Sequence, residues 1–403
     1  MCSLRFHLSG NRPVSDRRRG ACSNNLISRQ VAVHANNECE NLSPRQKRLA
    51  NQKLRKASQN NPAPPIKKVP SCNATKESRA PQVAVQYSTL ARNASARASG
   101  PVPFLCPTCG EDLLVAEPSS TGGKLLRCAS AHTVAVAKGG EVNLVPAGRT
   151  SRSAARGVRG DHDDSIRARR AFFESGGYQS QRDTVSAEVA RALAPLAVPP
   201  SARGRSERRT LHVLDAGTGE GAFLGDVAST LSHDRRFAGV GLDLVGTDIS
   251  KLAVKLAAKK YAMPAGAMRF AVALSNRLPF PDGSLDCVVS VLAPVPAKEF
   301  ARVLRPGGAL VVARPGPLHL QGVKALIYRD VAPQVAADVS ELPPATRVVT
   351  NCTQHTFCGE QAAQLFKMTP FYWKAPAELQ DLVCSGHKEF TTTVDFVVST
   401  YRF

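Results

Sequence analysis

The sequence of 403 residues contains no long apolar run. A membrane-spanning helix needs about eighteen or more consecutive apolar residues, so we expect the protein not to cross a bilayer. The N-terminus also lacks the apolar segment of about 7 to 15 residues that a secretory signal requires. Aromatic residues are few, at 5% with a single tryptophan, but a hydrophobic content of 43% can still supply a sizeable core. The length suffices for two or three domains.

Acidic residues are scarce in the first hundred residues. That region carries 18 Lys and Arg but only four Asp and Glu, so most of the net charge of +21 lies there. It shows no helical or strand period, which predicts a disordered tail over residues 1–100. Asp16 is the only acid among the first 35 residues. Enrichment in Arg and Ser without acids is typical of organelle transit peptides.

A transit peptide of this composition could direct the protein to either of two organelles. The segment Val33-His34-Ala35 resembles the small-residue cleavage context of chloroplast transit peptides, which predicts import into the chloroplast and cleavage near Ala35. The mitochondrion is the alternative, since both organelles use Arg-rich, Ser-rich presequences. An ordinary basic tail that tethers the protein to RNA also fits this composition.

The cysteine pattern does not indicate a disulfide framework. The eleven cysteines are an odd number and mostly scattered, which favours a reducing compartment. The exception is a C-x2-C pair followed by a C-x3-H pair, which places two thiolates on one tight turn and a thiolate with an imidazole on another. Such a set closes a tetrahedron without an open position and predicts a structural Zn²⁺. The expected ligands of this small zinc ribbon, residues 104–146, are Cys106, Cys109, Cys128 and His132.

Residues 211–221, LHVLDAGTGEG, predict an apolar strand followed by a glycine turn. Glycines at 217, 219 and 221 permit a ligand to approach the backbone closely, and Glu220 or Asp215 can receive its cationic amine. A second apolar strand ends at Asp248, which is placed to accept the hydroxyls of a ribose. Asp243 competes for that role, because it lies closer to the usual spacing after the glycine turn. The turn residues are Gly217, Gly219 and Gly221.

The remaining pattern alternates helices with strands. KLAVKLAAKKY predicts a helix, and the segment from MRFAVA to SVLAP predicts strand, loop and strand, with Ser275 and Asn276 where an adenine would lie. EFARVLRPGGALVVARP predicts a helix, a turn and another strand. This order favours an α/β fold with a doubly wound Rossmann-like sheet over residues 201–403. Residues 147–200 are expected to form a basic linker and a helical segment.

Several segments together resemble class I S-adenosylmethionine-dependent methyltransferases, and more closely the bacterial large-subunit rRNA guanine-N1 methyltransferases. The resemblance covers about residues 104–403. It is carried by CPTC and CxxxH, GEVNLVP, RARRAFFESGGYQ, VLDAGTGEG, SNRLPFPDGSLD, LRPGG, PGPLHL with KALIY, MTPFYWKA and TTTVDF.

The resemblance implies a methyltransferase sheet, preceded by the zinc ribbon, that uses S-adenosylmethionine to modify guanine N1 in rRNA. It assigns the zinc to the four ligands already named, and cofactor contacts to Tyr178, Gly219, Glu220 and His319. Tyr178 could instead close a helix end against the core, and His319 could be a surface histidine. No side chain stands out as the acceptor of the N1 proton. The sequence leaves the oligomeric state open between a monomer and a homodimer.

Three departures from that family's pattern bear on the function. Thr218 stands where the family has Cys, the strand before Asp248 carries extra residues, and Leu292 stands where bacterial relatives have an aromatic residue. A non-catalytic RNA-binding protein of an organelle ribosome is therefore one alternative. A small-molecule methyltransferase acting on quinones or sterols is another, although the zinc ribbon argues against it.

Overall fold

The computed structural model describes residues 100–116, 124–146, 160–197, 209–262, 268–335 and 339–403, all of which belong to one compact unit. The predicted disordered tail and the cleavage site near Ala35 lie outside these ranges. Within them, none of the helices combines the length and the hydropathy that a membrane span requires.

A small antiparallel sheet begins the described chain. Its four strands are joined in chain order, each paired with the next. Phe104 and Leu113 are buried beside Cys106 and Cys128, so the interior of this sheet lies next to the two cysteine turns. The strands are β1 (Phe104–Leu105), β2 (Asp112–Ala116), β3 (Leu125–Arg127) and β4 (Thr133–Ala135).

The main sheet has eight strands in the order β11-β12-β10-β9-β6-β7-β8-β5. From β10 to β5 all neighbours are parallel, whereas β12 is antiparallel to both β10 and β11. The central strands β6, β7 and β9 are almost continuously buried, as expected of parallel strands covered on both faces. The bounds are β5 (Val142–Asn143), β6 (Thr210–Ala216), β7 (Gly241–Asp248), β8 (Met268–Val272), β9 (Leu285–Val291), β10 (Leu304–Pro315), β11 (Arg347–Phe357) and β12 (Phe390–Arg402).

Helices cover both faces of this sheet, and alternate residues along a strand serve two separate cores. In β6, Leu211 and Val213 pack with α5, α6 and α7, whereas Leu214 and Ala216 pack with α8 and the small sheet. The predicted doubly wound α/β sheet is thereby confirmed. The helices are α4 (Asp163–Glu174), α5 (Gln179–Leu193), α6 (Ala222–His233), α7 (Lys251–Tyr261), α8 (Ala297–Val303), α9 (Gln321–Ala325), α10 (Gly359–Lys367) and α11 (Ala377–Cys384), with the short 3-10 turns η1 (Ala194–Leu196), η3 (Arg235–Phe237) and η5 (Tyr372–Lys374).

The small sheet is joined to the main one through β5. This strand pairs in parallel with β8 at the sheet edge, and Leu144 N–H donates to the Val272 carbonyl at 2.9 Å. On the other side, Leu105 N–H donates to the Pro279 carbonyl at 2.9 Å, and Phe104 packs on Phe280. These contacts fix the cysteine turns to the sheet.

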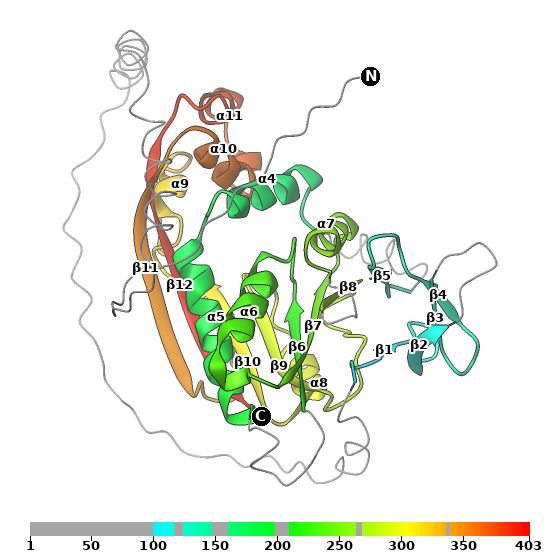
Figure 1. The fold of residues 1–403 in the computed structure, drawn as a ribbon. Helices are drawn as coiled ribbons and strands as arrows, with labels where there is room; N and C mark the ends of the chain where they lie inside the picture. Colours follow the sequence, from blue (N-terminus) through cyan, green and yellow to red (C-terminus); the bar gives the residue numbers. More distant parts are fainter. Residues whose placement is uncertain (1–99, 117–123, 147–159, 198–208, 263–267, 336–338) are drawn as a thin grey trace, which may run out of the picture. The chain divides into compact units, whose positions relative to one another are not determined.

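The order of strands reverses beside β6. From β6 the chain continues to β7 and β8 on one side, and then crosses to β9 and β10 on the other. Ligands of open α/β sheets bind in the crevice at the carboxyl ends of strands on either side of such a reversal. Figure 1 shows α4 lying across this end of the sheet, above β6 and β7.

Candidate functional site

The turn after β6 follows a backbone path that requires glycine. Gly217, Gly219 and Gly221 all have positive φ, at 85°, 55° and 82°. A Cβ on Gly217 would lie 2.6 Å from the Cβ of Ala293, which follows β9. The turn is held by the N–H groups of Gly217 and Thr218, which both donate to the Thr247 carbonyl in β7. Residues 217–221 therefore form a tightly held turn, the glycine cradle, in which positive φ and close neighbours leave room for glycine alone.

Asp248 and Asp243 occupy opposite ends of β7. The Asp248 carboxylate, at the carboxyl end, accepts hydrogen bonds from the N–H of Gly219 at 3.0 Å and of Ser250 at 2.8 Å. Asp243 lies at the other end of the strand, where it accepts from Arg269, from His212 and from the N–H of Val102. Asp248 therefore borders the glycine turn, whereas Asp243 ties the N-terminal segment to the sheet.

Asp215, the last acid of β6, is buried beneath the turn. Thr218 Oγ1 donates to its Oδ2 at 2.8 Å, whereas its Oδ1 has no hydrogen-bond partner among the described residues. Burial raises the pKa of Asp215 to about 7, and the nearby Asp248 charge acts in the same direction against the Thr218 hydrogen bond. Thr218 therefore stabilises the buried carboxyl group of Asp215 beneath the turn.

Glu220 does not face an open space. Its carboxylate accepts two hydrogen bonds from Arg169 Nε, at 3.0 and 2.9 Å, and Arg169 also pairs with Asp161. The Arg169 guanidinium lies 3.2 Å from where a Cβ on Gly219 would stand. Arg169 could not be predicted from the sequence, because nothing in the pattern of α4 distinguishes it from its arginine neighbours.

Tyr178 and His319 come together, although 141 residues separate them in the sequence. Their ring centroids are 6.0 Å apart, and both rings pack edge-on against Phe396. The Tyr178 hydroxyl is buried without a hydrogen-bond partner in the described chain, and its backbone has a φ of 55°. Tyr178 does precede a helix, α5, but that role leaves its hydroxyl unexplained.

His319 is buried, so it is not the surface histidine that the sequence also allowed. The N–H of Asp395 donates to its Nδ1 at 3.3 Å. Burial, with a smaller effect from the Lys324 charge, lowers the pKa of His319 to about 4. The ring is therefore neutral at physiological pH, and its Nε2 carries the proton and can donate a hydrogen bond.

Two further segments complete this end of the sheet. Leu292, directly after β9, has a φ of 50° and is 44% exposed, which is an unusual backbone conformation for an apolar side chain at a sheet end. Ser275 and Asn276 follow β8 in a turn closed by the bridge between Leu274 and Arg277. Both are at least partly exposed.

The four predicted metal ligands lie together in the small sheet. Their ligand atoms all lie within 4.8 Å of one another, with 3.6 Å between the Cys109 and Cys128 sulfurs and 3.5 Å between Cys128 Sγ and His132 Nδ1. A metal–sulfur distance of about 2.3 Å in a tetrahedron requires sulfurs about 3.8 Å apart, so this donor set fits zinc. Glu111 links the two turns by accepting from the N–H of Ser130 at 2.8 Å.

A glycine cradle at the strand reversal, with an acid at the end of the next strand, is an arrangement that nucleotide-binding α/β sheets share, and the match to known proteins assigns this one to the class I S-adenosylmethionine-dependent methyltransferases. Residues 213–308 match the model of a methyltransferase domain. Relatives also match over most of the chain.

A 23S rRNA (guanine-N(1)-)-methyltransferase of Micromonospora griseorubida is 30% identical over 305 residues, covering 74% of this chain and 96% of that protein. The 23S rRNA (guanine(748)-N(1))-methyltransferase of Streptomyces fradiae is also 30% identical, covering 73% and 95%. A 2-methyl-6-phytyl-1,4-hydroquinone methyltransferase of Synechocystis is 40% identical, but covers only 25% of this chain and 31% of that protein. The chain belongs to the family of 23S rRNA (guanine-N1)-methyltransferases.

Proposed function

We propose that this protein transfers a methyl group from S-adenosylmethionine to N1 of a guanine in the large-subunit rRNA of an organelle ribosome, that of the chloroplast, with the mitochondrion as the alternative. The RNA substrate is supported by the extent of the match, because the chain spans 95–96% of two relatives whose names state this reaction. The quinone methyltransferase matches over 108 residues only. That share supports a common cofactor domain and not a common substrate.

The described residues fit S-adenosylmethionine. The glycine turn gives backbone access, the orphan Oδ1 of Asp215 is an acceptor for an ammonium group, and Asp248 is an acceptor for ribose hydroxyls. When bound, the cofactor supplies an electrophilic methyl group on a sulfonium. Ser275 and Asn276 border the adenine position at the end of β8. The remaining donors on this side are Tyr178 and His319, with Gly221 and the paired Glu220 shaping the turn.

The protein's own residues contribute positioning and the exclusion of water. Methyl transfer from a sulfonium cancels a charge, so an in-line approach in a dry site can supply most of the acceleration. The rings of Tyr178, His319 and Phe396 pack on one another, and Tyr178 and Phe396 belong to the same core as Phe223, which follows the glycine turn. In this apolar setting the neutral His319 adds one donor without a charge. The Leu292 loop follows β9 next to Ala293 and is the segment that meets the acceptor base.

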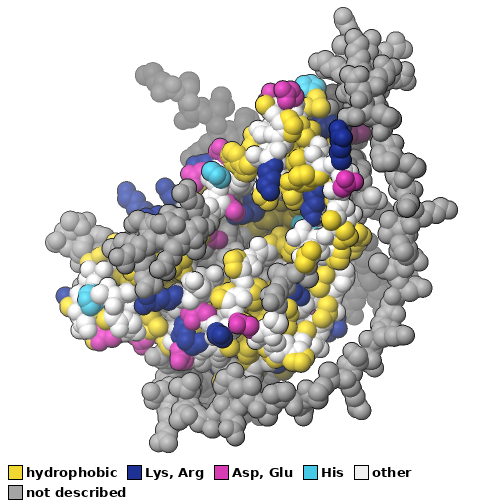
Figure 2. Space-filling model, turned by 180° about the vertical axis from the view of Figure 1, so that it is seen from behind, with side chains coloured by type: hydrophobic (Ala, Val, Ile, Leu, Met, Phe, Trp, Pro, Cys, Tyr) yellow, Lys and Arg dark blue, Asp and Glu magenta, His cyan; other side chains and the backbone are white. Residues whose placement is uncertain are grey.

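RNA must present an unpaired guanine, because N1 is engaged in a base pair within a helix. On the face seen in Figure 2, several Lys and Arg side chains flank a hollow in the surface. Cations of this kind contact phosphates, which position the RNA without selecting a sequence. The cysteine turns, fixed to the sheet by β1 and β5, are a second rigid element that can grip RNA structure, with Zn²⁺ as their structural metal.

The organelle address rests on the tail. A Lys- and Arg-rich, acid-poor N-terminus joined to a bacterial-type rRNA methyltransferase suits a bacterial-type ribosome, such as the one in plastids. A fluorescent fusion of residues 1–100 should accumulate in chloroplasts. Accumulation in mitochondria would favour the mitochondrion as the site of action. A diffuse cytosolic signal would indicate that the tail is an ordinary basic segment and not a transit peptide.

The substrate is tested by mapping N1-methylguanine in organelle large-subunit rRNA from cells with and without this protein. We expect one modified guanine that disappears with the protein and returns with the wild-type gene. The same pattern of N1-methylguanine with and without the protein, in both organelles, would contradict organelle rRNA as the substrate.

A further inference from the structure

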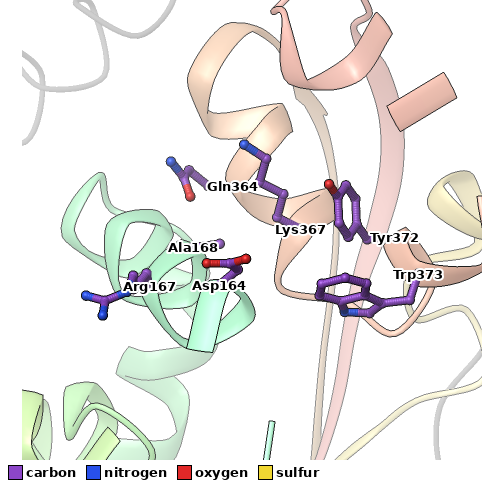
Figure 3. A pocket seen from close by; sticks show the side chains of 7 residues that line it. All are labelled: Asp164, Arg167, Ala168, Gln364, Lys367, Tyr372 and Trp373. Atoms are coloured by element: carbon purple, nitrogen blue, oxygen red, sulfur yellow. The ribbon is translucent and has the colours of Figure 1, made fainter. Parts of the chain in front are cut away.

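A pocket of about 320 Å³ lies between α4 on one side and α10 with η5 on the other. It combines two aromatic rings with a carboxylate, an amide and two cations, and Figure 3 shows these side chains. None of them belongs to the cofactor site described above. The lining residues are Asp164, Arg167, Ala168, Gln364, Lys367, Tyr372 and Trp373.

Helix α4 separates this pocket from the glycine turn. Asp164, Arg167 and Ala168 follow the i, i+3, i+4 spacing of one helix face. Arg169, which contacts Glu220 in the turn, lies about 150° around the helix from the centre of that face at about 100° per residue. A group held in the pocket is therefore not the methyl acceptor.

Tyr372 and Trp373 form the aromatic wall of the pocket, and contacts with the protein itself fix the Trp373 ring. Trp373, the only tryptophan of the chain, donates from Nε1 to Ser165 Oγ at 3.3 Å, and its ring packs on that of His162 at 4.6 Å. Tyr372 meets it edge-on at 5.1 Å. Trp373 nevertheless remains 47% exposed, so part of a fixed indole surface is open for stacking.

The pocket also holds polar groups next to the aromatic rings, and one of them, Asp164, is an acceptor. Figure 3 shows the Asp164 carboxylate pointing across the gap toward Tyr372 and Trp373, with Gln364 and Lys367 along the side. Asp164 is exposed and forms no hydrogen bond or ion pair with any residue that the structure describes. A carboxylate only accepts hydrogen bonds. Among the four bases, guanine alone presents two adjacent donors, N1–H and the N2 amino group, to such an acceptor.

We propose that this pocket binds a second unpaired guanine of the RNA, stacked on Trp373 and bonded through its Watson–Crick edge to Asp164. The inference rests on the proposed function for the identity of the RNA, but not for the chemistry of the pocket. By capturing one guanine on the far side of α4, the enzyme sets which neighbouring nucleotide reaches the cofactor.

The single tryptophan provides the measurement. The full-length protein, without S-adenosylmethionine, is titrated with GMP, IMP and AMP while Trp373 emission is recorded, and N-acetyltryptophanamide corrects for light absorbed by the nucleotides. We expect quenching in the order GMP, IMP, AMP, because IMP lacks the amino group and AMP lacks both donors. Asp164→Asn should weaken GMP binding about 10-fold and remove the preference.

Asp163→Asn is the matched control. It removes the same charge from the same first turn of α4, but Asp163 does not line the pocket, so the GMP preference should persist. Equal quenching by GMP and AMP, or equal effects of the two variants, would overturn the proposal. Because no methyl transfer is involved, guanine-selective quenching by a chain that fails to methylate RNA would contradict the proposed function alone.

Discussion

Arg169 and Glu220 form an ion pair over the glycine turn, with Nη2 and Oε1 2.9 Å apart, although 51 residues separate them in the sequence. The Glu220 side chain is only 4% exposed. This pair joins α4 to the turn after β6. Glu220 therefore already has a cation, and we propose the Oδ1 of Asp215, which has no hydrogen-bond partner among the described residues, as the acceptor for the amine of the cofactor.

Removal of Arg169 should destabilise the fold. Arg169→Ala leaves the buried Glu220 carboxylate without its cation, and we expect a loss of about 3 kcal/mol in the free energy of unfolding, measured by urea denaturation. Arg170→Ala is the control, since Arg170 pairs with an exposed Glu174 and should contribute at most about 0.5 kcal/mol. Similar losses in both variants would contradict the role of the buried pair.

Substitutions of the two acids of β7 should have different effects, one on cofactor affinity and the other on the free energy of unfolding. Asp248→Ala is expected to weaken S-adenosylmethionine binding by about 1 to 3 kcal/mol, measured by calorimetry, because charge-assisted hydrogen bonds are lost. Asp243→Ala removes the partner of Arg269 and His212, so it should lower the free energy of unfolding by about 3 kcal/mol with little change in affinity. A larger affinity loss in Asp243→Ala would transfer the ribose role.

Cofactor affinity should depend on pH through Asp215. Burial raises its pKa to about 7 in the free protein, and a cationic cofactor favours the ionised form. Affinity should therefore fall by up to about 10-fold for each pH unit below 7, as the carboxyl takes up a proton. Calorimetry between mildly acidic and mildly alkaline pH checks this slope. Asp215→Asn should bind more weakly and show a flatter profile; an equally steep profile in that variant would assign the slope elsewhere.

The raised pKa of Asp215 should also make the free energy of unfolding decrease as the pH rises. Because the folded-state pKa of Asp215 lies above the value of 3.8 for a free side chain, the folded state holds the proton more tightly. The corresponding stability is complete below pH 3.8 and is lost as the pH rises through about 7. Asp215→Asn should remove this decrease from the curve of unfolding free energy against pH. Persistence of the full decrease would rule out Asp215 as its source.

Zinc should bind in a one-to-one ratio and support the small sheet. In Cys106→Ser, Cys109→Ser the metal measured in purified protein should disappear, and proteolysis should begin within residues 104–146. A double Cys287→Ser, Cys384→Ser variant is the control, since neither cysteine lies in the metal cluster. Full zinc content in the first variant would refute the assignment of these ligands.

The sequence predicted where helices and strands occur better than it predicted which strands pair with each other. The glycine turn, the helix at residues 251–261 and the buried strands were all recognisable from local pattern. The edge strand β5, the insertion of β12 between β10 and β11, and the start of β10 ahead of its Pro-Gly-Gly turn were not. Strand order depends on packing between distant segments, and local periodicity carries no information about it.

The same reason limits what the sequence could say about the site. Asp243 and Asp248 have similar spacing from the glycine turn, and only their hydrogen bonds separate a structural acid from one that borders the cradle. Tyr178 and His319 were found through family resemblance alone. The pocket on α4 could not be predicted, because Asp164 and Trp373, which both line it, are more than two hundred residues apart in the chain.

The most direct test of the methyltransferase assignment is a reaction with purified components. The protein is incubated with S-adenosylmethionine and an unmodified large-subunit rRNA transcript, and the digested RNA is analysed by mass spectrometry. We predict 1-methylguanosine at a single position, absent with Gly219→Val, which blocks the cradle, but retained with Gly239→Val, where a glycine of positive φ has no neighbour within 4 Å. Methylation of another atom, or none with the wild-type protein, would contradict the account.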